Sequence, residues 1–180
     1  MTTGRKNQEY QIDKAENPWN WLHPVDMFSV TDTKDDTKDQ LWHIFTDGSK
    51  SEQGVGSGVA VFTWKVLTEQ LKFKLDNRCC NNQAEQLAII KALEVIESQQ
   101  ENHNERRTAV IYTDIKKTLD SIRSAKNHNH LIEEIRNRAA TLNKKNWETE
   151  FKWVKAHAGI FRNEIADQLM KKVTQNYYVT

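Results

Sequence analysis

The sequence predicts an α/β fold in which a mixed sheet of five strands is flanked by helices. Two observations predict this fold. Three strand-like runs first follow one another with only short turns between them, which is typical of an antiparallel meander. Two later strand-like runs are each preceded by segments whose apolar residues have helical spacing, which favours crossovers that add parallel strands.

The strand assignments rest on short apolar or alternating runs. The first run, LWHIFTD, ends at an Asp-Gly pair that predicts a turn, and three glycines give the second run a flexible start. The fourth run, TAVIYTD, is continuously apolar, as in strands buried on both faces. The fifth run places Phe151 and Trp153 on one face. The predicted strands are residues 41–47, 54–64, 66–75, 108–114 and 148–156.

Four amphipathic segments predict helices between and after these strands. In the first, an apolar stripe runs from Ala84 to Ile96, and Asn81 or Asn82 can cap its start. In the last, a similar stripe runs from Ala166 to Val173. The predicted helices are residues 81–99, 115–125, 131–142 and 163–173.

Residues 1–40 differ from the rest of the chain, because they are polar and hold 8 Asp/Glu against 5 Lys/Arg. We interpret them as an arm or linker. Its aromatic segment 18–28 is expected to dock on this domain or on a neighbouring one, with a loosely ordered tail as the alternative. The predicted domain covers residues 41–175, and residues 176–180 form a tail.

The composition excludes several classes of protein. No run of about 18 apolar residues is present, so no membrane span is predicted, and the first residues lack the apolar core of a signal peptide. The two cysteines, Cys79 and Cys80, are adjacent, which predicts neither a disulfide framework nor a thiolate zinc site. We therefore expect a reducing compartment, the cytoplasm or the nucleus. A net charge of +1 does not by itself indicate nucleic-acid binding.

Acidic residues stand at the ends of predicted elements. Asp47 ends the first strand, Asp114 ends the fourth, and Glu85 lies in the first turn of the first helix. In open α/β sheets, ligands bind beyond the carboxyl ends of the strands, so these three side chains are expected to converge. A fourth acid, Asp167, lies on the polar face of the last helix.

Each acid also has a purely structural interpretation. Asp47 can belong to a turn, Asp114 can cap the next helix, and Glu85 can favour a helix N-terminus by its charge. Asp167 can be a solvated helix residue. The arrangement of all four is what favours a functional site over these alternatives.

Clustered carboxylates repel one another unless a cation lies between them. Oxygen ligands without cysteine, and with few histidines, favour Mg²⁺ or Mn²⁺ over zinc. Two such ions can clamp a phosphodiester, one activating water and the other stabilising the leaving oxygen. The chemistry that the acids indicate is therefore phosphodiester hydrolysis.

Four motifs in order, TDGS (46–49), NNQAE (81–85), YTD (112–114) and WVKAHAGIFRNEIAD (153–167), resemble the type 1 ribonuclease H family. The resemblance covers residues 41–173. It implies a ribonuclease H-like α/β fold, with strands one to three antiparallel and the last two added in parallel. It also implies an endonuclease that cuts the RNA strand of RNA–DNA hybrids with two Mg²⁺ ions, for which Mn²⁺ is a possible substitute.

The resemblance also implies roles for individual residues. His157 matches a loop histidine that assists proton transfer or product departure, although without the adjoining motif it reads as an ordinary loop residue. Asn163 helps position this histidine or caps the last helix, and it is included among the substrate-binding residues. The four residues that match the family's metal-binding and catalytic carboxylates are Asp47, Glu85, Asp114 and Asp167.

Substrate contacts follow from the same match. The backbone of Gly48 and Ser49, with Glu85, is expected to contact RNA 2′-hydroxyls, the groups that distinguish RNA from DNA. Asn82 and Gln83 are expected to lie against the duplex. Because these contacts address backbone and shape, no base sequence should be read.

The chain departs from the family pattern at several places. Ile115 stands where relatives usually have Ser, and Cys80 stands where many place a Thr in a pocket for DNA phosphate. The connection 124–130 is short and lacks the basic handle of many cellular relatives. We therefore expect weak binding of hybrid by the isolated domain.

In detail the motifs resemble the domain that follows reverse transcriptase in non-LTR retrotransposon polyproteins. A tethered reverse transcriptase would supply affinity through effective concentration, and the domain itself is expected to be a monomer. The alternatives are a stand-alone cellular ribonuclease H that removes primers or R-loops, and an inactive hybrid-binding domain. A transposase or integrase of the superfamily fits less well, because the early Glu and the His-containing loop argue against it.

Overall fold

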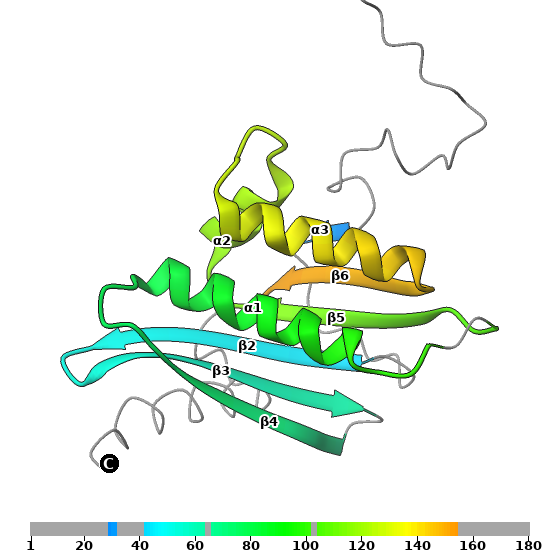
Figure 1. Ribbon diagram of the computed structural model, residues 1–180, viewed down its shortest axis with the longest axis horizontal. Helices are drawn as coiled ribbons and strands as arrows, with labels where there is room; N and C mark the ends of the chain where they lie inside the picture. The colour runs from blue at the N-terminus through cyan, green and yellow to red at the C-terminus, as the bar shows by residue number, and fades with distance from the viewer. Residues whose placement is uncertain (1–28, 32–41, 64–65, 102–103, 155–180) are drawn as a thin grey trace, which may run out of the picture.

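A computed structural model describes residues 29–31, 42–63, 66–101 and 104–154. These residues form one six-stranded sheet, in the order β1-β6-β5-β2-β3-β4, with three helices (Figure 1). The strands are β1 (Ser29–Thr31), β2 (Trp42–Ser51), β3 (Gly54–Thr63), β4 (Val66–Leu75), β5 (Arg107–Thr113) and β6 (Trp147–Trp153). The helices are α1 (Asn81–Glu97), α2 (Lys116–Arg123) and α3 (His130–Lys144).

The pairing of the strands confirms the predicted mixed sheet. Strands β2, β3 and β4 are antiparallel neighbours, β5 is parallel to β2, and β6 is parallel to β5. The short strand β1 adds a sixth member, which was not predicted. It pairs in parallel with β6, with Val30 opposite Phe151. Three residues are too few to show a strand period, and β1 lies in the segment that we interpreted as an arm.

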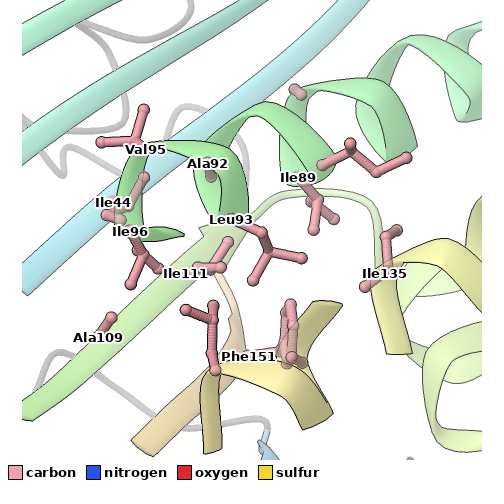
Figure 2. Close-up of a cluster of buried hydrophobic side chains, with 14 of the residues drawn as sticks. Ile44, Ile89, Ala92, Leu93, Val95, Ile96, Ala109, Ile111, Ile135 and Phe151 are labelled. Carbon is pink, nitrogen blue, oxygen red and sulfur yellow. The ribbon is translucent and has the colours of Figure 1, made fainter. Parts of the chain in front are cut away.

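The helices cover one face of the sheet (Figure 1). Figure 2 shows Leu93 and Ile96 of α1 near Ile111 of β5 and Phe151 of β6, all of them fully buried in the main hydrophobic core. Since successive side chains of a strand alternate between faces, Phe45 and its partners form a second cluster on the opposite face. The predicted closing helix 163–173 and the aromatic segment 18–28 lie outside the described residues.

Two local predictions were wrong. No turn follows Asp47, because β2 continues to Ser51 and pairs Asp47 with Gly58. Gly48 instead allows close packing, since a Cβ there would collide with the backbone of α1. The cap of α1 is Cys80 rather than Asn81 or Asn82, and its N–H donates to Gln83 Oε1 at 2.9 Å. None of the helices in the described part of the chain is long and apolar enough to cross a membrane.

Candidate metal centre

Three predicted site residues meet at one end of the sheet. Ligand oxygens of Asp47, Glu85 and Asp114 all lie within 4.8 Å of one another. Asp47 lies within β2, Asp114 directly follows β5, and these two strands are parallel neighbours. Glu85 reaches the same place from α1, which packs on β2 and β3. The predicted convergence of these three acids is confirmed.

The structural alternatives for these acids do not hold. Asp47 is not in a turn, and the N-cap of α2 is Ile115 rather than Asp114. Glu85 is the fifth residue of α1, beyond the first turn, so our placement of it in the first turn was wrong. Its side chain is fully buried instead of lying near the exposed helix terminus. The three structural interpretations therefore do not account for the positions of these acids.

The segment that carries Asp114 is held by the end of β6. Val154 N–H donates to Thr113 O at 2.9 Å, and Trp153 Nε1 donates to Asp114 O at 3.0 Å. Both contacts fix the backbone at the point where the Asp114 side chain joins the cluster. Trp153, predicted only as an apolar strand residue, thus also holds the Asp114 backbone.

The environment of Glu85 favours its neutral form. Burial raises the pKa of the Glu85 carboxyl to about 7, and the nearby charge of Asp114 acts in the same direction. The nearby hydroxyls of Thr113 and Thr46 and the nearby N–H of Gly48 oppose this rise. A carboxyl with this pKa is poised to lose its proton when a cation binds beside it.

The cluster fits a hard divalent cation. Oε1 of Glu85 accepts a hydrogen bond from Thr46 at 2.6 Å, whereas its buried Oε2 has no hydrogen-bond partner among the described residues. A buried oxygen without a donor is costly unless something else satisfies it. Three carboxylates match the ligands of Mg²⁺ or Mn²⁺, and in the described ranges no cysteine or histidine belongs to the group.

The predicted substrate residues lie beside this cluster. Gly48 and Ser49 are half-buried on β2, with Gly48 against the start of α1. Asn82 and Gln83 are half-buried in the first turn of α1, and the Gln83 side chain is engaged in the helix cap. His157, Asn163 and Asp167 lie outside the described residues, so their roles stay predictions.

Three residues whose hydrogen bonds hold this region together were not predicted from the sequence. Lys50 Nζ donates to the carbonyls of Asn77 and Cys79, at 3.0 and 3.1 Å, and so ties the loop before α1 to β2. The other two are the buried hydroxyls of Thr46, which bonds to Glu85, and Ser57, which bonds to the backbone of α1. Hydroxyl residues inside otherwise apolar strands were the available signal.

Comparisons with known proteins agree with this architecture. The ribonuclease H1 of the halophilic archaeon Halobacterium salinarum has a similar structure, with a TM-score of 0.56 and 20% sequence identity over 73% of this chain and 96% of that chain. At this identity the likeness shows the fold. No curated protein sequence matches the chain. The family model described as RNase H matches residues 39–175, and the chain therefore belongs to the RNase H family.

Proposed function

We propose that the chain cuts the RNA strand of RNA–DNA hybrids by metal-dependent hydrolysis of internal phosphodiester bonds. The observation that carries this proposal is the group of buried Asp47, buried Glu85 and half-buried Asp114, with oxygens within 4.8 Å of one another, in a member of the RNase H family. A purely structural domain has no need of three acids gathered from separate elements in a largely buried place.

These three carboxylates would hold the divalent cations, and Asp167 is proposed as a fourth ligand. The ions, Mg²⁺ or Mn²⁺, would supply charge neutralisation at the scissile phosphate and would lower the pKa of a bound water. We propose two of them, with His157 aiding proton transfer. The chain's own contribution is to hold the carboxylates in place against their mutual repulsion, which the rigid pairing of β2 with β5 provides.

The hybrid would lie across the start of α1. The Gly48 backbone and Ser49 adjoin the metal centre there, and Asn82 lies in the first turn of the helix. Contacts from this edge to RNA 2′-hydroxyls would select the RNA strand. Because such contacts address the backbone, cleavage should not depend on base sequence.

The first test incubates the protein with an end-labelled RNA–DNA hybrid in Mg²⁺, beside RNA–RNA and DNA–DNA duplexes. Internal cuts in the RNA of the hybrid alone are expected. Asp47→Asn should abolish them, because it removes a negatively charged ligand while nearly preserving shape. Circular dichroism should show the variant folded. Cleavage at the wild-type rate by this variant would refute the assignment.

We further propose that the domain acts in retrotransposon reverse transcription, tethered to a polymerase. The connection between α2 and α3 spans only residues 124–129, which leaves no room for a basic handle. A tether would replace the missing affinity. Fusion to a hybrid-binding domain should therefore lower the KM strongly without changing kcat. If the isolated domain already binds hybrid tightly, the stand-alone cellular role becomes the better proposal.

A further inference from the structure

We propose that Thr46 and Ser57 are positioning residues that hold Glu85 in its metal-binding place. The inference rests on the proposed function, since it concerns the residues behind the metal centre. Both residues are fully buried and come from the adjacent strands β2 and β3. One hydroxyl acts on the carboxyl of Glu85, and the other acts on the helix that carries it.

Thr46 fixes the carboxyl itself. Its Oγ1 lies 2.6 Å from Glu85 Oε1 and 3.0 Å from the carbonyl oxygen of Tyr112. A hydroxyl has a single proton to donate, and charge-assisted bonds are the short ones. When Glu85 is ionised, the Thr46 hydroxyl therefore donates to Oε1, and Oε2 stays without a hydrogen-bond partner among the described residues. Oε2 is the atom that this arrangement keeps for a cation.

Ser57 fixes the helix. Its Oγ donates to the carbonyl oxygen of Ala84, the residue before Glu85, at 2.5 Å. Gly48 of β2 touches the same stretch of backbone, so closely that a Cβ there would collide with the backbone atoms of Ala84 and Glu85. At Ala84 and Glu85, helix α1 therefore packs closely on β2 through Gly48 and is hydrogen-bonded to β3 through Ser57.

The need for such fixing follows from the repulsion between the acids. Carboxylates whose oxygens lie within 4.8 Å of one another repel when ionised, so the Thr46 donor on Oε1 is needed to hold Glu85 toward Asp47 and Asp114. Side chains behind metal ligands commonly act in this way, and their loss weakens metal affinity by about 10- to 100-fold.

The test measures Mn²⁺ binding to the metal-free full chain by isothermal titration calorimetry, a readout that needs no turnover. Thr46→Val keeps the shape of the side chain and removes the hydroxyl, and it should weaken binding by about tenfold or more. Thr46→Ser, which restores a hydroxyl, should recover most of the affinity. Ser57→Ala should weaken binding less, because it acts through the helix backbone.

Thr149→Val is the matched control. Thr149 lies on β6 of the same sheet and is also fully buried, but its hydroxyl has no hydrogen-bond partner in the described ranges. The same chemical change there should leave Mn²⁺ affinity unchanged. Urea unfolding of every variant separates loss of the fold from loss of the site.

The outcomes are distinct. Wild-type affinity in a folded Thr46→Val protein would overturn the inference while leaving the proposed function intact. If Thr46→Val does not fold, Ser57→Ala decides, and wild-type affinity in that variant would overturn the inference. If the unmodified chain binds no Mn²⁺, or if Asp47→Asn binds it equally well, the proposed function fails instead.

Discussion

Two fully buried ionisable side chains, Arg136 of α3 and Glu85 of α1, differ in how completely they are hydrogen-bonded. Each of the five N–H groups of Arg136 has an acceptor. The acceptors are the Glu133 carboxylate and the carbonyl oxygens of Ser121, Ile122, Ser124 and Asn127. Glu85 has a donor on one oxygen, whereas its other oxygen has no hydrogen-bond partner within the described segments.

This difference in hydrogen bonding distinguishes a side chain that stabilises the fold, Arg136, from one that belongs to the candidate site, Glu85. Arg136 satisfies carbonyls at the end of α2 and in the connection to α3, which are groups that a helix C-terminus leaves open. The buried guanidinium of Arg136 therefore needs no further hydrogen-bond partner. Glu85 is equally buried but incompletely hydrogen-bonded. Its burial raises the pKa of its carboxyl to about 7, and its second oxygen is left for a ligand that the described part of the chain does not provide.

The largest effect on stability is expected from Arg136→Met. The substitution removes the donor from the buried Ile122 carbonyl and from partly buried carbonyls around it, and losing one member of a buried hydrogen-bonded charge network costs about 3–5 kcal/mol. The free energy of unfolding in urea should fall by that amount. The molecules that remain folded should keep their cleavage rate, because the side chain lies away from the acids. A loss below about 1 kcal/mol would mean that the connection reorganises around the gap.

Arg136 also shows what the sequence can reveal. It lies four residues after Ile132 and three before Ala139, so it stands on the apolar face of its helix. That position indicates a buried cation. Its partners could not be predicted, because they are backbone carbonyls brought together only when the connection folds over α3.

The candidate site likewise has features that the sequence predicted and features that it could not predict. Strand periods and motif order predicted that Asp47 and Asp114 would end beside each other, since the crossovers make β2 and β5 parallel neighbours. The Asp-Gly turn was wrong because local sequence cannot show that Gly48 is needed for contact with a distant helix. The cap at Cys80 and the three-residue strand β1 were missed because each has too little local signal.

The second effect tests the buried but incompletely hydrogen-bonded Glu85 in the absence of metal. Its folded pKa of about 7 exceeds the ordinary value of 4.5. The stability that its protonated form provides is therefore complete below pH 4.5 and is lost as the pH rises through 7. Glu85→Gln cannot ionise, so it should gain on the order of 3 kcal/mol over the wild type between these two limits.

Urea unfolding of both proteins in a chelator, across this pH range, measures the difference. A difference in unfolding free energy that stays constant with pH would show that Glu85 ionises normally. Added Mg²⁺ should reverse the order of stability above neutral pH, because only the wild type retains all three carboxylates.

The smallest effect is expected from Arg138→Met, two residues after Arg136 on the same helix. Arg138 pairs with Glu97 of α1 at 2.7 Å, and with Glu94 and Glu134 at 3.5 and 3.0 Å, but its side chain is 28% exposed. Water screens such pairs, so the loss should be about 1 kcal/mol or less and should shrink in high salt. Measured beside Arg136→Met, it separates the effect of complete burial from that of charge pairing. Equal losses in the two variants would show that complete burial and full hydrogen bonding give Arg136 no advantage over the partly exposed ion pairs of Arg138.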